Sequence, residues 1–309
     1  MNTTTENNKE PTIGIQLVKE LRNKTSSSFV ECKKALVVCD GDLEKAVEWL
    51  KEQGLVKLKK LSGGVARMGA VCALMDKENA IVLEVNSVTD FVGKNETFQA
   101  FVKEVAKQAL KGNGNLEDLK KGPYGNGHTV EEELSLITSG IGEKIDIRRL
   151  EKINIKDGKG YLYVHNVLTP GLGQRAAMVV LDKEPLDKEL GNLLAMHIVA
   201  STPKSLSRYD LDPTILAAEK ATQLEVIEQS GKPKEIFDKI LEGKMNKYFE
   251  SIVLLEQDFN FTNDDKACKV SKILKDNGVN IVNYAYLVLG EGIEEQVNDF
   301  AADVAKMIQ

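Results

Sequence analysis

The sequence predicts an α+β protein built from several packed units. Helical patterns fill the N-terminal part, strand and helix patterns share the middle, and two long helical patterns flank a turn near residue 231. Separate runs of helices and strands are typical of α+β architecture. The predicted units are a three-helix domain (12–54), a linker (55–69), a core of two subdomains (70–152 and 153–290), a helical hairpin inserted in the second subdomain (212–249) and a C-terminal helical module (291–309).

Length and charge narrow the classes of function. The chain has 309 residues, enough for two or three compact units. Its net charge of −6 argues against a general nucleic-acid-binding protein, because such proteins usually carry a basic excess. No apolar run approaches the ~20 residues that cross a bilayer. Four cysteines without a CxxC pair indicate reduced thiols in a cytosol-like compartment.

The N-terminal domain carries local signals for three helices. Ser28, followed by Glu31, has the spacing of a capping box at the start of the second helix. Asp42 is a good N-cap for the third helix, and Gly54 is expected to end it in a left-handed conformation. The lysine- and glycine-containing segment that follows predicts a flexible linker, because it lacks the residues of a phosphate-binding loop.

The core is predicted from apolar runs and turn residues. A β-hairpin is expected first, and the strand–turn–strand–helix order appears in both halves, which suggests two related subdomains. The predicted strands are 70–75, 80–85, 145–150, 161–167, 176–181, 253–256 and 281–289. The predicted helices that follow the β-hairpin are one of about twenty residues near 91, one at 186–201 and one at 264–277.

Two further helices are predicted to form the protruding hairpin. Asp212 and Pro213 are typical of a helix start, and the Ser-Gly-Lys-Pro segment from Ser230 ends one helix before the next begins. The apolar stripe is narrow, which suits two helices that pack mainly on each other. Its predicted members are Ala217, Ala221 and Leu224 on the first helix and Phe237, Ile240 and Leu241 on the second.

The segment 86–95, Asn-Ser-Val-Thr-Asp-Phe-Val-Gly-Lys-Asn, joins a buried strand to a helix. Ser87, with Asp90 three residues later, resembles a capping pattern and predicts the helix start. Phe91 has two readings. It fits the buried stripe of the helix that continues through Phe98, or it overhangs the core and is offered to a partner. Spacing alone does not distinguish them.

Several segments resemble one family, elongation factor Ts, the guanine-nucleotide exchange factor of elongation factor Tu. The similar segments are NSVTDFVGKN, SGIGEKIDIRRL, QSGKPKEI with LEGKMNKYF, the ending EGIEE…DFAADVAKM, and VKELRNKTSSSFVECKKAL with GDLEKAVEWL. The last pair resembles the ubiquitin-associated-type domain that opens the family. The resemblance implies a protein that promotes GDP release from elongation factor Tu by displacing Mg²⁺ and loosening the phosphate site, so that GTP can bind.

The same resemblance implies which residues contact the partner. It assigns partner binding and Mg²⁺ dislocation to Thr89, Asp90, Phe91 and Val92. Weaker similarity adds further contact residues. These are Lys33, Ile141, Gly142, Glu143, His165 and Phe261. The segment after His165, Asn-Val-Leu-Thr-Pro, departs from the family's glycine-rich pattern.

The sequence shows no pattern for covalent catalysis, metal or cofactor binding, so we expect no enzyme, no cofactor and no metal ion. Three histidines are present and none lies near a cysteine in sequence. Two alternatives stay open: a docking protein that leaves nucleotide kinetics unchanged, and a small-molecule enzyme with a site in the core. We expect a bacterial cytoplasmic protein, or an organellar one whose targeting peptide has been removed, that binds neither membrane nor nucleic acid.

Overall fold

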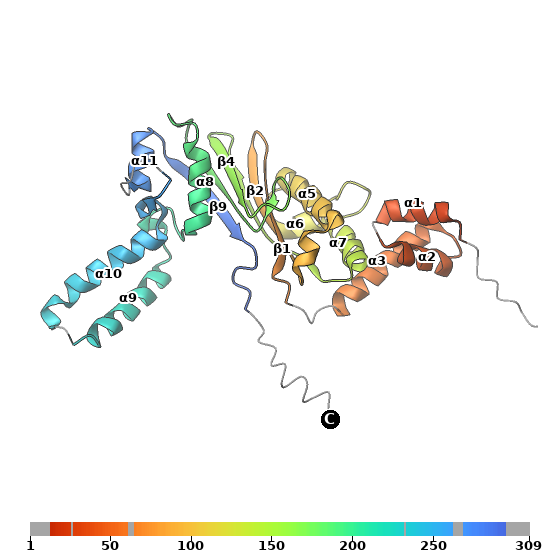
Figure 1. Ribbon diagram of the computed structural model, residues 1–309, viewed down its shortest axis with the longest axis horizontal. Coiled ribbons are helices and arrows are strands. Elements are labelled where there is room, and N and C mark those ends of the chain that lie inside the picture. Colours follow the sequence, from red (N-terminus) through yellow and green to blue (C-terminus); the bar gives the residue numbers. More distant parts are fainter. Residues whose placement is uncertain (1–12, 26, 61–64, 232, 262–267, 295–309) are drawn as a thin grey trace, which may run out of the picture.

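The structure is a computed structural model that describes residues 13–25, 27–60, 65–231, 233–261 and 268–294. Along the longest axis, a helical module lies at one end, two sheets with their covering helices lie in the middle, and a helical hairpin lies at the other end (Figure 1). The mixture of helices and sheets confirms the α+β class. The predicted C-terminal helix lies outside the described residues from 295 onward. None of the described helices is both long and apolar enough to cross a membrane.

The helical module consists of α1 (Ile15–Thr25), α2 (Phe29–Val38) and α3 (Leu43–Lys60). Ser28 caps α2 by accepting a hydrogen bond from the Glu31 backbone, and Asp42 accepts two from the first turn of α3, as predicted. The module buries a small set of apolar side chains. These are Val18, Leu21, Cys32, Ala35, Leu36, Ala46 and Leu50, joined by Leu136 from a helix of the core.

The prediction that Gly54 ends the third helix is wrong, because α3 continues to Lys60. Gly54 instead lies where α3 packs against α7 (Val130–Ile141). A Cβ atom at this position would lie 2.4 Å from the carbonyl oxygen of Ser135. The glycine therefore permits a close helix–helix contact, a role that the local sequence does not reveal. Residues 55–60, placed in the linker by the sequence prediction, belong to this helix.

Two antiparallel sheets form the centre of the molecule. The first has the strand order β3-β2-β1-β5 and the second has the order β4-β6-β9. The predicted hairpin is confirmed as β1 and β2. The strand bounds are β1 Met68–Met75, β2 Asn79–Ser87, β3 Ile145–Asn154, β4 Lys159–His165, β5 Leu172–Gly173, β6 Arg175–Leu181 and β9 Ile281–Val288. The short β5 crosses from the second half of the chain to pair with β1.

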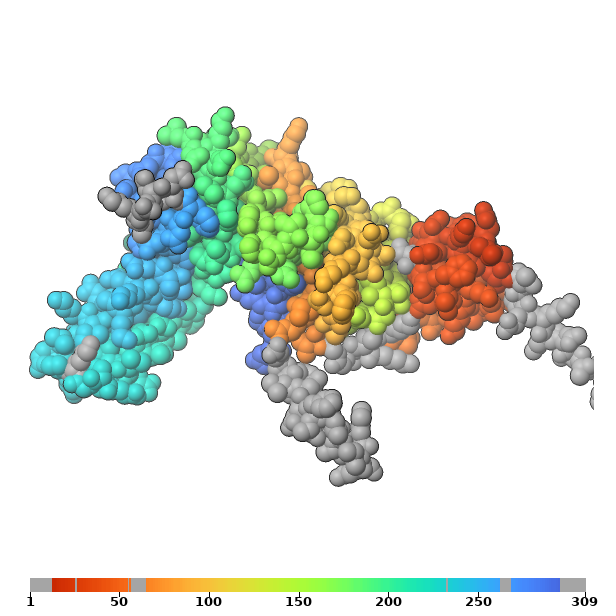
Figure 2. Space-filling view, viewed as in Figure 1, coloured from red at the N-terminus to blue at the C-terminus, as the bar shows by residue number. Residues whose placement is uncertain are grey.

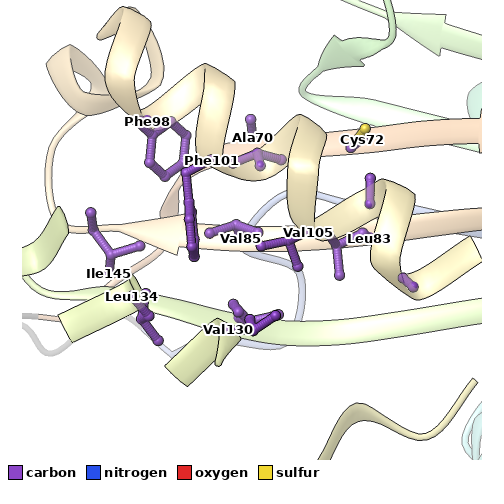
Figure 3. Packing of buried hydrophobic residues seen from close by; sticks show 14 of the residues in the cluster. Ala70, Cys72, Leu83, Val85, Phe98, Phe101, Val105, Val130, Leu134 and Ile145 are labelled. Carbon is purple, nitrogen blue, oxygen red and sulfur yellow. The ribbon is translucent and has the colours of Figure 1, made fainter. Parts of the chain in front are cut away.

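Each sheet is covered on both faces, which explains why the inner strands β1, β2 and β6 are apolar almost throughout. Along β1, Ala70 and Cys72 face the helices α5 (Glu96–Lys111) and α7, whereas Val71 and Ala73 face the second sheet. In Figure 3, Phe98 and Phe101 of α5 lie beside Ala70 and Val85 of the strands, and Val130 and Leu134 of α7 lie lower in the same cluster. The outer face of the second sheet packs against α8 (Leu190–Ser201). The layers are thus helix, sheet, sheet, helix.

The helix of about twenty residues predicted near residue 91 is two helices. A single turn, α4 (Asp90–Gly93), comes first, and α5 begins separately at Glu96. Asn95 caps α5 by accepting hydrogen bonds from the backbone of Thr97 and Phe98. Ser87 is not the N-cap of α4, because its hydroxyl donates to the Thr89 carbonyl and Thr89 occupies that position. The break in direction removes Phe91 from the buried stripe of α5.

Two predictions near the end of the chain are also wrong. Residues 254–256 form a 3₁₀ turn rather than a strand. The helix expected from residue 264 begins at Val270 as α11 (Val270–Asp276), because the short strands β7 (Asp258–Phe259) and β8 (Cys268–Lys269) pair before it. Residues 264–267 of that prediction lie outside the described residues. A further short helix of the core is α6 (Leu116–Lys121).

The hairpin projects from the second sheet as α9 (Pro213–Glu228) and α10 (Phe237–Ile252) (Figures 1 and 2). Asp212 caps α9, with proline at the first helical position, as predicted. On α9 the predicted stripe is wrong, since Ala217, Ala221 and Leu224 are exposed. The packed face contains Leu216 and Ile227 with Gln223, which accepts a hydrogen bond from Lys244 of α10. The predicted members on α10 are partly buried.

Candidate partner-binding site

In the turn between β2 and α5 (residues 88–95, the Phe91 turn), the side chains of two adjacent residues have opposite environments. The Phe91 side chain is 75% exposed, whereas Val92 is only 3% exposed and packs in the cluster under α5. This decides between the two readings of Phe91, because it is not part of the core stripe. Val92 is buried, so its side chain anchors the turn from below rather than offering a surface.

Close backbone packing fixes α4 on the sheet. A Cβ atom on Gly93 would lie 2.8 Å from the carbonyl oxygen of Gly69, the second residue of β1. Gly69 itself has φ +120°, and a Cβ there would lie 2.2 Å from the Val85 carbonyl oxygen. Two glycines thus let α4 pack directly against the open end of the β1–β2 hairpin. A larger residue at either position would push the turn, and Phe91 with it, away from the core.

A carboxylate from a distant segment holds the start of the turn. Glu143 accepts hydrogen bonds from the Thr89 hydroxyl at 2.8 Å and from the Thr89 backbone N–H at 3.0 Å. Gly142 makes this possible, since it ends α7 with φ +82° and turns the chain toward β3. The structure therefore brings together two segments that the sequence only suggested separately. Hydrogen bonds to an ionised group are stronger than neutral ones.

The exposed rim of the turn is charged. Asp90 pairs with Lys94 at 3.2 Å, and both side chains are more than half exposed. The Lys94 ammonium also lies 5.8 Å from the centre of the Phe91 ring. Exposed ion pairs contribute little to stability, so these charges are available to a partner at small cost to the fold.

The other predicted contact residues are distributed over the molecule. Ile141 is partly buried against the cluster between α5, α7 and the first sheet, and Gly142 is exposed beside it. Lys33 is exposed on α2 of the helical module. Phe261 is partly buried, with its ring edge-on to those of Phe259 and His197. Phe261 packs against the cluster between the second sheet and α8, so it lies in a different part of the core from the Phe91 turn.

His165 is exposed at the end of β4, where its Nδ1 lies 3.1 Å from the Tyr163 hydroxyl. The segment that follows it, which departs from the family pattern, does reach the candidate site. Leu168 packs against the cluster between α5, α7 and the first sheet, and its Cδ1 would lie 3.6 Å from a Cβ on Gly93. The departure therefore falls in a segment that supports α4 from the side.

His197 is a buried histidine on α8. It is 4% exposed, and its Nε2 lies 3.0 Å from the Gln257 side-chain oxygen. Burial lowers the pKa of His197, and the hydrogen bond to Gln257 offsets this only in part. The residue acts as a neutral link between α8 and the base of the hairpin, where Gln257 also donates to the Ser251 carbonyl.

Sequence reasoning missed a buried ionic cluster. Glu84 is completely buried on β2, and it accepts hydrogen bonds from Arg148 and Arg149 of β3 and from the Gly290 backbone. Arg149 also donates to the Val288 carbonyl. The cluster therefore joins the first sheet to the end of β9 in the second. One glutamate inside an apolar strand was the available signal, because a buried carboxylate requires partners.

The fold and the site define an α+β protein that presents an aromatic side chain on a turn fixed by glycine packing and by a carboxylate. A family model described as "Elongation factor TS" matches residues 88–291, and one described as "Elongation factor Ts, mitochondrial, N-terminal" matches residues 8–60. The chain belongs to the elongation factor Ts family, and is thus a translation elongation factor of protein biosynthesis.

Individual relatives agree with this family along nearly the whole chain. The chain is 40% identical over 305 residues to the elongation factor Ts of Rhodospirillum centenum, covering 96% of this chain and 98% of that protein. It is 39% identical over 293 residues to the elongation factor Ts of Gluconobacter oxydans, covering 94% and 96% respectively. The similarity therefore includes the helical module, the core and the hairpin.

Proposed function

We propose that this protein binds elongation factor Tu in its GDP-bound form and accelerates GDP release, in a bacterial-type cytoplasm. It acts as an exchange factor rather than as an enzyme that makes or breaks covalent bonds. The observation that carries the proposal is the exposed Phe91 on an anchored turn. Membership of the family supports the identity of the partner.

The proposed mechanism is a coupling between two ligands of the same GTPase. If the exchange factor and the GDP–Mg²⁺ pair favour incompatible conformations of the partner, each weakens the binding of the other by the same factor. Phe91 inserts into an apolar cleft of the partner and displaces a segment near the Mg²⁺ site. Loss of Mg²⁺ removes charge neutralisation from the phosphates, so GDP leaves and GTP can bind.

The Phe91 turn is suited to this role because it is already ordered. Burying a flexible aromatic residue would carry an entropic cost at the moment of binding, and prior ordering avoids this cost. Val92 and the Gly93–Gly69 contact order the turn from below, and Glu143 orders it from the side. Asp90 is free to contact a polar group of the partner, since its own ion pair is exposed.

The Gly142 segment has a second part in the proposal. Gly142 is exposed and carries no side chain, so the partner's phosphate-binding loop can approach its backbone closely. Glu143 is partly buried and accepts hydrogen bonds from Thr89, so it acts as a positioning residue for the turn. Lys33 on the helical module supplies a separate contact with the GTPase.

The test is the release of a fluorescent GDP analogue from elongation factor Tu, chased with excess GTP, with and without this protein. We expect faster release in its presence, and a smaller acceleration as free Mg²⁺ is raised, because the metal and the exchange factor compete through the partner's conformation. Binding of the two proteins with unchanged GDP release would contradict the proposal and would favour a docking function.

A further inference from the structure

Helix α7 is buried on two opposite sides by two different parts of the molecule. Leu136 is completely buried among the apolar side chains of the helical module. Val130, Leu134 and Ile137 belong to the cluster between α5 and the first sheet. A helix that completes two cores cannot move with one and leave the other unchanged, since both interiors are closely packed. In Figure 1, α7 lies between α3 and the sheets.

The contact between α3 and α7 is close and specific. The Gly54 backbone approaches the Ser135 carbonyl so closely that a Cβ would lie 2.4 Å from the oxygen and 2.8 Å from its carbon. One turn earlier along α3, Lys51 forms an ion pair with Glu132 at 3.2 Å. The Ser139 hydroxyl donates to Glu31 of α2 at 3.4 Å. Contacts of this kind fix one orientation of the helical module.

The end of α7 leads directly to the Phe91 turn. Gly142 caps the helix, and Glu143 accepts hydrogen bonds from Thr89. A continuous series of packed elements therefore runs from the module that carries Lys33, through α7, to the turn that carries Phe91. Within the described residues, each step of this series is a direct contact between packed elements.

We propose that α7 holds the helical module as a fixed arm, so that Lys33 and Phe91 meet the partner as one preorganised surface. Gly54 and Leu136 are the positioning residues of this arrangement, although neither touches the partner. The inference rests on the proposed function for the identity of the partner. If this holds, loosening the α3–α7 contact weakens binding to the partner. Once the geometry is no longer fixed, the effective concentration of the second contact falls after the first has formed.

The decisive variant is Gly54→Ala, with Gly243→Ala as its matched control. Both glycines lie inside helices, where alanine ordinarily favours the helix. A Cβ at Gly243 would have no atom within 4 Å, whereas at Gly54 it would meet backbone atoms that cannot rotate away. We expect the concentration for half-maximal GDP exchange to rise by about tenfold in Gly54→Ala. The maximal exchange rate and the Gly243→Ala control should stay at wild-type values.

A second comparison distinguishes loss of the fixed module orientation from unfolding of the module. Lys33→Ala should raise the half-maximal concentration in the wild type and raise it much less in the Gly54→Ala background. Trp49, the one tryptophan of the chain, lies on α3. Its fluorescence reports whether the helical module is folded. If Gly54→Ala unfolds the module, the milder Leu136→Val is compared with wild type in the same way.

The outcomes are distinguishable. If wild-type protein does not accelerate GDP release, the proposed function fails before the variants are compared. If wild type is active and folded Gly54→Ala has the same half-maximal concentration, the module is an independently hinged domain and the inference is overturned. Fully additive effects of Gly54→Ala and Lys33→Ala would overturn it as well.

Discussion

Glu143 and Thr89 lie 54 residues apart in the chain and are joined through both carboxylate oxygens of Glu143. The contact connects the end of α7 to the first residue of the Phe91 turn. Glu143 therefore has an intramolecular partner, whereas the family resemblance alone implies that it faces the GTPase. This difference can be tested by separating stability from exchange.

Replacing Glu143 by alanine should lower the free energy of unfolding by about 1.5–3 kcal/mol, the typical contribution of hydrogen bonds to a charged group. GDP exchange should slow because the turn is less ordered, and Glu143→Gln should lie between alanine and wild type since it keeps one acceptor oxygen. Urea unfolding and exchange kinetics measure the two effects. Full stability with abolished exchange would instead indicate direct contact between Glu143 and the partner.

Removal of the buried charge at Glu84 should be among the most destabilising single substitutions. Its carboxylate is completely buried and receives two arginines and a backbone N–H. Breaking a buried ionic cluster by removing one member costs about 3–5 kcal/mol. We expect Glu84→Ala to lose this amount in chemical denaturation, whereas Glu151→Gln on the exposed side of β3 should change little. A loss below about 1 kcal/mol would show that the cluster is dispensable.

The buried His197 predicts a pH dependence of stability. Its pKa is lowered in the folded protein, so the unfolded chain binds the proton more readily. The stabilising contribution is complete above the unfolded pKa of about 6.5 and is lost as the pH falls below it. His197→Gln should flatten the fall in unfolding free energy between about pH 7.5 and 5.5. An unchanged slope in that variant would assign the dependence to other groups.

Local sequence signals correctly predicted the features that depend on interactions between nearby residues. The caps at Ser28, Asp42 and Asp212 and the β1–β2 hairpin follow from residues within a few positions of each other. The break before α5 was also encoded locally, by the N-cap Asn95, but the regular apolar spacing through Phe98 obscured it.

Long-range contacts could not be predicted in the same way. Gly54 has the local appearance of a helix stop, and only the approach of Ser135 explains why it lies within a helix. Glu84 meets a backbone N–H that is 206 residues away. The packed face of α9 was missed because apolar residues lie on several sides of the helix, with Ile215, Leu224 and Val226 exposed, so their spacing does not identify the buried face. The family resemblance, rather than the residue pattern, indicated Phe91 as a contact residue, and its exposure depends on the Thr89–Glu143 contact and the glycine packing beneath it.

The most direct measurement is the rate of fluorescent GDP release from elongation factor Tu with Phe91→Ala, compared with wild type and with Leu186→Ala. Leu186 is 81% exposed, so its truncation removes a similar exposed apolar side chain elsewhere. We expect Phe91→Ala to keep wild-type thermal stability and to reduce exchange by a factor that corresponds to about 2 kcal/mol or more, with Leu186→Ala unchanged. Wild-type exchange by folded Phe91→Ala protein would contradict the account.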